Sequence, residues 1–288
     1  MEIITPSYAP DRELCGDLAR SVGRFAPAGT RHTVIVPPRD AALFRPLEDE
    51  GADVRSTREV MPRGFVRIPF ANVWLSARAP WPPVRGWIAQ QIIKLSAAAS
   101  STADAVVIAD SDVAFVRRFS LDDFLIDGRV PLYRWADAVT GGLPRHLAWD
   151  AVARRLLGLP ADRTVPRPDY ICWPCVWDPA VVRGALQRVE RTSGTPWAVA
   201  IGRELHFSEM VLYGVYAEHV LSASRPMPVT VDMHCPSFSD ERALDGPELD
   251  DFLARLTPDD IAVMISAKSG TDLARRRAAI SAVTGPDV

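Results

Sequence analysis

Two aspartates, Asp110 and Asp112, directly follow a short apolar run at residues 105–109. In an extended chain, residues two apart point the same way, so both carboxylates can face one cation. Mg²⁺ and Mn²⁺ prefer oxygen ligands, and such an ion can stabilise the charge on a departing diphosphate. With 25 aspartates in 288 residues, about two Asp-x-Asp pairs are expected by chance. A solvated acidic turn is therefore the alternative interpretation.

Glu209 is a candidate general base. It is predicted to lie at the start of a helix, with Tyr213 and Tyr216 following on the same face. A carboxylate near a helix N-terminus is held ionised, as a general base must be. A purely structural or capping role for Glu209 is equally consistent with its position.

Gln91 and Lys94 stand one helical turn apart, so both side chains can reach the same ligand. The chain has only one other lysine, Lys268. Lys94 is therefore a candidate contact to a phosphate or an acid, although a solvated surface charge is the common role of a lysine.

The segment Cys172-Trp-Pro-Cys175 resembles a zinc or redox pair in its spacing. A structural zinc site needs four ligands, and a redox pair needs a strand before it and a helix after it. Neither context is evident, so buried or pocket-lining thiols are expected. Tyr170 and Trp173, in the same stretch, can form an apolar platform for a sugar ring.

Alternating strand and helix patterns predict a parallel sheet in the first part of the chain. Apolar runs before turn residues predict strands, and apolar residues at helical spacing predict helices. The predicted strands are 2–5, 32–36 and 105–109, and the predicted helices are 11–25, 43–50 and 86–99. Residues 60–83, rich in Pro, Arg and Trp, are expected to form an irregular loop. Ligands bind at the carboxyl ends of strands in such sheets, where Asp110 and Asp112 lie.

The second part of the chain mixes short strands and helices. Helices are predicted at 180–190 and 206–221, and a strand at 229–232. The tail is expected to contain a helical segment after Pro258, a turn at 268–270 and a last helix. No linker or repeat interrupts the chain. We therefore expect one domain over residues 1–288.

Composition excludes several classes of protein. Apolar residues make up 48% and charged residues 24%, as in ordinary globular proteins. A net charge of −3 argues against nucleic acid as a partner, and no apolar run is long enough to span a membrane. Four cysteines and the absence of an export signal favour a reducing cytoplasm.

The chain resembles a group of bacterial proteins assigned to the nucleotide-diphospho-sugar transferase superfamily, which has the GT-A fold. The resemblance rests on ordered blocks between residues 4 and 214. These blocks are Ile4-Thr-Pro-Ser-Tyr8 with Asp11, Gly86-Trp87, Gln90-Gln91-Ile-Ile-Lys94-Leu95, Asp110-Ser-Asp112-Val-Ala-Phe115, Trp177-Asp178-Pro179, Phe207-Ser-Glu209 and Leu212-Tyr213-Gly214.

The resemblance implies an α/β fold of GT-A type, a Rossmann-like mixed sheet flanked by helices. Residues 1–120 would form the nucleotide-binding half, and residues 121–288 the acceptor half with the C-terminal helices. The loop after the first strand would hold the base and ribose, with Tyr8 stacking on the base. The implied donor contacts are Thr5, Pro6, Ser7, Tyr8, Asp11, Gln91, Lys94 and Ser111.

The resemblance also implies a metal-dependent glycosyltransferase that moves a sugar from a nucleotide diphosphate sugar, by default a uridine one, to an acceptor. Asp110, Asp112 and a late residue, His234, would bind Mn²⁺ or Mg²⁺, with Asp232 as the rival of His234. Glu209 would deprotonate the acceptor in an inverting enzyme, and Tyr170, Trp173 and Tyr213 would contact the acceptor. A retaining enzyme, or a module that binds the sugar nucleotide without turnover, is the alternative.

Overall fold

A five-stranded sheet forms the centre of the protein. The computed structural model describes residues 1–68 and 71–285. The strand order is β12-β7-β1-β2-β3, in which four strands run parallel and β12 is an antiparallel edge. The strands are β1 (Glu2–Pro6), β2 (Arg31–Val36), β3 (Ala52–Ser56), β7 (Val106–Ile108) and β12 (Cys175–Trp177). The predicted α/β class with a parallel sheet is confirmed.

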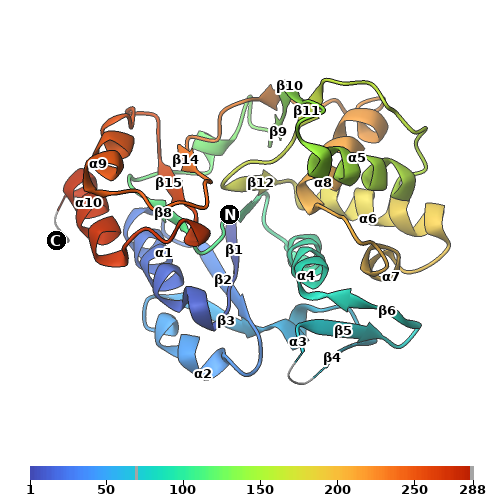
Figure 1. Cartoon of the computed structure of the whole chain (residues 1–288), viewed down its shortest axis with the longest axis horizontal. Coiled ribbons are helices and arrows are strands. Elements are labelled where there is room, and N and C mark those ends of the chain that lie inside the picture. The colour runs from blue at the N-terminus through green and yellow to red at the C-terminus, as the bar shows by residue number, and fades with distance from the viewer. Residues whose placement is uncertain (69–70, 286–288) are drawn as a thin grey trace.

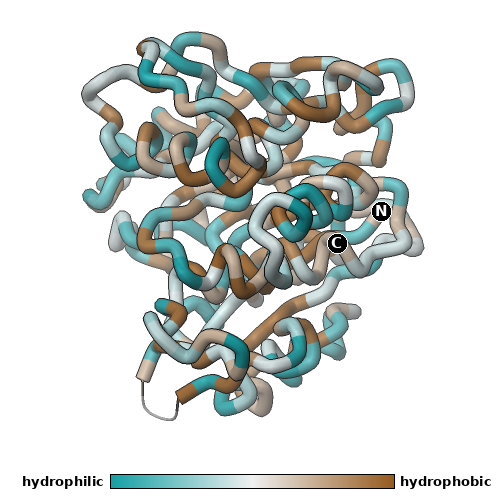
Figure 2. Tube along the Cα trace, turned by 90° about the vertical axis from the view of Figure 1, so that its right-hand side faces the viewer, coloured by the Kyte–Doolittle hydropathy of each residue, from teal (hydrophilic) through white to brown (hydrophobic). Residues whose placement is uncertain are grey.

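Helices cover both faces of this sheet (Figure 1). Alternate residues of β2 point to opposite faces, so Val34 and Val36 pack with α1 and α2 while Ile35 joins the core that contains α4. In Figure 2 the helices alternate between hydrophobic and hydrophilic stretches, as expected when one face of each covers a core. The helices are α1 (Arg12–Phe25), α2 (Ala41–Phe44), α4 (Gly86–Ser100) and α6 (Pro179–Ser193).

The predicted helix at 43–50 is broken. The chain forms the single turn of α2 and then a 3₁₀ turn, Arg45–Glu48. Pro46 explains the change, because it lacks the N–H that a continuing α-helix would need.

The expectation of an irregular loop at 60–83 is wrong. After a short helix, α3 (Thr57–Val60), this part of the chain forms an antiparallel sheet of three strands. Prolines occupy three positions of its edge strand β6, where a missing N–H costs no ladder bond on the open side. The strands are β4 (Phe65–Arg67), β5 (Val73–Ser76) and β6 (Ala79–Arg85).

The tail also differs from the prediction. Instead of a helical segment after Pro258, Ala262–Ile265 forms strand β15, which is buried along its whole length. It pairs antiparallel with β8 (Val113–Phe115) and parallel with β14 (Ser237–Phe238). The predicted turn and last helix are present, as a 3₁₀ turn at Ala267–Ser269 and α10 (Leu273–Thr284). The C-terminal segment is thereby placed beside the Asp110–Asp112 turn, because β15 is next to β8 (Figure 1) and Ile265 N donates to the carbonyl of Asp112.

The remaining elements complete the molecule around the central sheet. Helix α8 begins at Glu209, three residues later than expected, because Ser208 caps it through a hydrogen bond from Val211 N. The predicted strand at 229–232 shortens to β13. These elements are β9 (Leu132–Tyr133), β10 (Trp135–Val139), α5 (Pro144–Leu156), β11 (Arg167–Asp169), α7 (Trp197–Gly202), α8 (Glu209–Tyr216), β13 (Val229–Thr230) and α9 (Gly246–Ala254).

One main core joins the two parts of the chain. It contains Ile3 and Phe115 from the first part and Trp177 and Met264 from the second. Within residues 1–68 and 71–285, no helix combines the length and apolarity needed to cross a membrane.

Candidate active site

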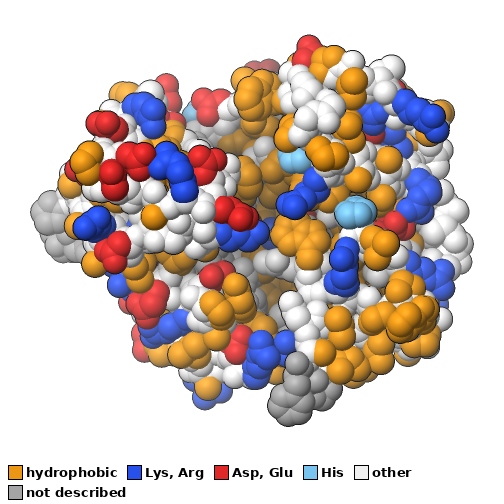
Figure 3. All heavy atoms as spheres, in the orientation of Figure 1, with side chains coloured by type: hydrophobic (Ala, Val, Ile, Leu, Met, Phe, Trp, Pro, Cys, Tyr) orange, Lys and Arg blue, Asp and Glu red, His pale blue; other side chains and the backbone are white. Residues whose placement is uncertain are grey.

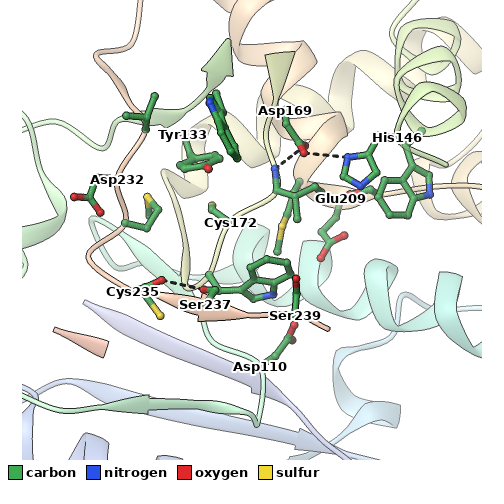
Figure 4. A pocket seen from close by; sticks show the side chains of 18 of the residues that line it. Asp110, Tyr133, His146, Asp169, Cys172, Glu209, Asp232, Cys235, Ser237 and Ser239 are labelled. Carbon is green, nitrogen blue, oxygen red and sulfur yellow. Dashed lines mark hydrogen bonds and ion pairs between the residues drawn. The ribbon is translucent and has the colours of Figure 1, made fainter. Parts of the chain in front are cut away.

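A cavity of about 620 Å³ opens at the carboxyl end of β7. Its volume is typical of sites for small molecules. The space-filling view is hollowed between the C-terminal elements and the part that carries α5 and α8 (Figure 3). Polar lining residues include Gln91, Lys94, Asp110, His146, Asp169, Ser208, Glu209, Asp232, Ser237, Ser239 and Asp260, and aromatic ones are Trp87, Tyr133, Trp135, Trp149 and Trp173 (Figure 4).

Lys94 joins two carboxylates at this cavity. Its Nζ lies 2.9 Å from Oδ1 of Asp110 and 3.3 Å from Oε1 of Glu209. Lys94 and Glu209 are buried, whereas the Asp110 side chain is 30% exposed. Burial alone would lower the pKa of Lys94, but Asp110 and Glu209 outweigh it and raise the pKa above its ordinary value. Lys94 is therefore a fixed cation between two anions.

Gln91 completes this group from the same helix. When its amide is oriented so that its NH₂ donates, it hydrogen bonds both carboxylate oxygens of Glu209. The predicted pairing of Gln91 and Lys94 on one face of α4 is present, and both side chains meet Glu209. The sequence did not reveal that Lys94 and Gln91 both contact Glu209, the candidate general base.

Asp112 is held by the C-terminal segment. Its Oδ2 accepts a hydrogen bond from Ala267 N at 2.9 Å, and its carbonyl accepts one from Nη2 of buried Arg276 at 2.7 Å. Arg276 also donates to the carbonyl of Ile265 at 2.8 Å. The Asp110–Asp112 turn is thus positioned by residues that follow it by more than 150 positions.

Acidic side chains converge beside this turn. Burial, followed by the charges of Asp112 and Asp110, raises the pKa of Asp11 to about 6. Burial and the charge of Asp110 also raise the pKa of Asp112. These shifts mark negative charge that the surrounding protein does not fully neutralise, an environment that a cation would stabilise.

The donor set fits a metal only in part. Two carboxylates at one turn suit Mg²⁺ or Mn²⁺, which commonly use one or two carboxylates together with substrate phosphates and water. His234 does not line the cavity, and its Nδ1 lies 3.8 Å from Asp232. Among the residues described, no group of three or more His, Cys, Asp or Glu side chains is arranged to hold a metal ion.

The predicted nucleotide loop is divided between buried and exposed residues. Thr5 and Pro6 are buried in β1, and Thr5 Oγ1 lies 3.0 Å from His32 Nε2. Ser111 donates a hydrogen bond to Ser7, at 2.9 Å between their oxygens, which ties the loop to the Asp110–Asp112 turn. Tyr8 is 46% exposed and so is available to a ligand.

Only one of the three predicted acceptor contacts lines the cavity. Trp173 does so, and it is joined to Pro174 by a cis peptide bond. Tyr170 is buried, and its OH donates to Glu218 at 2.8 Å. Tyr213 is also buried and stacks on Trp177.

Cys172 and Cys175 are buried thiols. Cys172 and Cys175 are free, and Cys172 lines the cavity while Cys175 lies in β12. Burial and neighbouring Cys172 raise the pKa of the Cys175 thiol. A protonated thiol is a poor nucleophile and metal ligand, in agreement with the expected structural role.

Several site residues were missed by the sequence interpretation. Trp149 and His146 come from α5, Trp135 from β10 and Asp169 from β11, three consecutive elements between residues 135 and 169. No short motif links them. For the two tryptophans the only sequence signal is the abundance of this residue, with eight in the chain, and for His146 and Asp169 there is none.

Comparisons with known proteins add the following. A search of curated proteins found no match. Similar solved structures include mouse xyloside xylosyltransferase 1 in its apo form, with 11% identity and a TM-score of 0.44, covering 94% of this chain and 100% of that chain. They also include the galactosyltransferase LgtC with donor and acceptor sugar analogues, with 12% identity and a TM-score of 0.47, covering 100% and 98% of the two chains. The model of the family described as "Family of unknown function (DUF6492)" matches residues 3–230, and the chain belongs to that family.

Proposed function

We propose that the protein is a glycosyltransferase that takes its sugar from a nucleotide diphosphate and uses the cavity at the end of β7. The main support for this proposal is the buried Lys94, which contacts both Asp110 and Glu209 at a cavity that several aromatic residues line. Sugars fit such a lining, because their hydroxyls bond carboxylates while their C–H faces pack on aromatic rings.

Asp110 and Asp112 would hold Mg²⁺ or Mn²⁺ together with the donor phosphates. The ion would supply stabilisation of the negative charge that develops on the diphosphate. Asp110 is available for this role because its side chain is partly exposed and lines the cavity. Lys94 would hold the Asp110 carboxylate in place. Residues 1–120 would then form the donor half and residues 121–288 the acceptor half.

The surroundings of Glu209 favour a positioning role over that of a general base. A base must take up a proton from the acceptor, but both oxygens of Glu209 face Gln91, and Oε1 also faces Lys94. Its side chain is only 4% exposed. These contacts support the alternative in which Glu209 fixes Lys94 and another group, or the leaving diphosphate itself, accepts the proton.

Glu209→Gln separates these roles. If Glu209 is the base, turnover should fall by roughly 10² to 10⁴ with donor affinity near normal. If it positions Lys94, donor affinity should fall together with turnover. The anomeric configuration of the product, read by NMR, gives an independent result, because retention excludes Glu209 as the base of a direct inversion.

The function is tested by a thermal-shift panel of nucleotide diphosphate sugars with and without Mn²⁺. A ligand that binds the native state alone must raise its stability. Sugar transfer or hydrolysis by the best-bound donor would then support an enzyme. Binding without turnover would indicate the silent module, and the absence of any binding would contradict the proposal.

A further inference from the structure

A histidine and an aspartate meet in the wall of the cavity, away from Asp110. Nδ1 of His146 lies 3.0 Å from Oδ2 of Asp169. Both residues line the cavity, and their side chains are 21% and 14% exposed, respectively. Figure 4 shows the two side chains facing each other at one end of the pocket.

The carboxylate of this pair is fixed. Its other oxygen, Oδ1, accepts hydrogen bonds from the backbone N–H groups of Tyr170 at 2.8 Å and Ile171 at 3.1 Å. Asp169 ends β11, and the loop that follows folds back onto its side chain. The position of Oδ2 relative to His146 is therefore set by the backbone.

A buried ion pair holds together the two elements that carry the pair. Arg167 in β11 contacts Asp150, which lies one helical turn after His146 in α5. Both residues are buried, and Arg154 also pairs with Asp150 at 3.0 Å. The His146 ring is further packed against Trp149, with ring centroids 4.9 Å apart. The His146 ring is thus in contact with Asp169 and Trp149, and the ion pair fixes the two elements that carry His146 and Asp169.

We infer that His146, oriented by Asp169, is the general base that takes the proton from the acceptor hydroxyl. A carboxylate at Nδ1 favours the tautomer that carries the proton there, which leaves Nε2 as an acceptor. An imidazole held by a carboxylate is the usual arrangement of a base and its orienting group. The inference rests on the proposed transferase function and assigns to His146 the role that the contacts of Glu209 leave open.

The step balances without another reactant. The acceptor O–H proton passes to Nε2 of His146, and the oxygen lone pair forms the bond to the anomeric carbon. The bond from that carbon to the diphosphate oxygen breaks, and its electron pair leaves with the nucleoside diphosphate. His146 then releases the proton to water.

The tautomer can be read without any substrate. In ¹⁵N NMR spectra at pH 8, His146 should carry its proton on Nδ1, and Asp169→Asn should shift the proton toward Nε2. Protonation of Nε2 in the wild-type protein would overturn the inference, because that nitrogen could not accept a proton.

The catalytic role of His146 is tested by measuring the rate at which UDP is released from donor sugars. UDP-glucose, UDP-galactose and UDP-N-acetylglucosamine are supplied with Mn²⁺, with water as acceptor, and UDP is measured. His146→Gln should lower kcat by roughly 10² to 10⁴ with little change in UDP affinity by calorimetry. Because Asp169 acts through His146, Asp169→Asn should lower kcat too, and the double variant should be no slower than His146→Gln alone.

His206→Gln is the matched control, since His206 is exposed and is not among the residues that line the cavity. It should keep wild-type kcat. A folded His146→Gln variant within threefold of wild type, or additive effects in the double variant, would overturn the inference while leaving the transferase function standing. Failure of the wild-type protein to bind UDP or to release it from these donors would instead contradict the proposed function, and with it the role of His146.

Discussion

Lys94 is buried between two carboxylates, so removing its charge leaves both carboxylates without the cation that they contact. We expect Lys94→Met to lower the free energy of unfolding by about 3–5 kcal/mol, as found when one partner of a buried ion pair is lost. Urea unfolding at pH 7 measures this.

The chain offers its own control, because its other lysine, Lys268, pairs with Glu241 at 3.8 Å in an exposed position. Lys268→Met should change the unfolding free energy by less than about 0.5 kcal/mol. Adding Glu209→Gln to Lys94→Met should restore part of the loss. Equal stability of wild type and Lys94→Met would show that the triad is not a buried charge network.

The raised pKa of Asp11 implies that the stability of the protein depends on pH. Its pKa rises from 3.8 to about 6 on folding, so between these values the folded state binds a proton that the unfolded state releases. The stabilisation from this proton is complete below about pH 4 and is lost as pH rises through about 6. Asp11→Asn should therefore raise the melting temperature relative to wild type at pH 7 but not at pH 4.

Asp11 makes no side-chain capping hydrogen bond to α1, so the asparagine loses no cap. Asp104→Asn, at an exposed carboxyl before β7, should show no such pH-dependent difference. A constant difference between Asp11→Asn and wild type from pH 4 to pH 7 would contradict the proposed crowding of acids beside the Asp110–Asp112 turn.

At the residue scale, the sequence predicted some of the side chains that lie at the site, but it did not predict the long-range contacts that hold them. Gln91 and Lys94 face one site because helical spacing dictates it, and Asp110 lies at a strand end as predicted. The hydrogen bonds from Ala267 and Arg276 to Asp112 follow from pairing between β8 and β15. Pairing over such a separation leaves no local sequence pattern.

At the scale of elements, α8 is fixed by one close approach. The Tyr170 ring lies over Gly214, where an added Cβ would come within 2.2 Å of the ring Cγ. Alanine is favoured over glycine in a helix by about 1 kcal/mol, but this clash in a packed core should dominate. We expect Gly214→Ala to lower the unfolding free energy by about 1–3 kcal/mol, measured by urea unfolding.

Gly141→Ala is the matched control, because an added Cβ there meets no atom within 4 Å. It should leave stability within about 0.5 kcal/mol of wild type. If Gly214→Ala were as stable as this control, Tyr170 would not be packed in the core, and its predicted contact with an acceptor would regain support.

Elements with a clear hydrophobic periodicity were predicted well. Strands whose formation depends on pairing with a distant strand were not. Helix α4 and strand β7 match their predicted positions to within one residue at each end, because apolar spacing and turn residues mark them. Strands β4–β6 were missed because prolines normally exclude strands, and only the edge position of β6 tolerates them. A run of four apolar residues, such as that of β15, is compatible with a helix or a strand. Its pairing with β8 is what makes this segment a strand.

At the scale of the whole molecule, the cavity draws on both parts of the chain. Lys94 and Asp110 come from the first 120 residues, while Glu209, Trp173 and the His146–Asp169 pair come from the rest. The main core also runs through both parts. A transfer reaction requires its two substrates to be held side by side, and a cavity lined by both parts of the chain underlies the proposed function.

The most direct test of this function is calorimetric titration of UDP in the presence of Mn²⁺. Asp112→Asn keeps an oxygen to accept the hydrogen bond of Ala267 but removes the charge, whereas Asp104→Asn removes an exposed charge near the opposite end of β7. We predict that wild type and Asp104→Asn bind UDP equally, and that Asp112→Asn binds at least about tenfold more weakly, a loss of about 1.4 kcal/mol. Equal affinity in all three proteins, or no binding by the wild type, would contradict a nucleotide site at the Asp110–Asp112 turn.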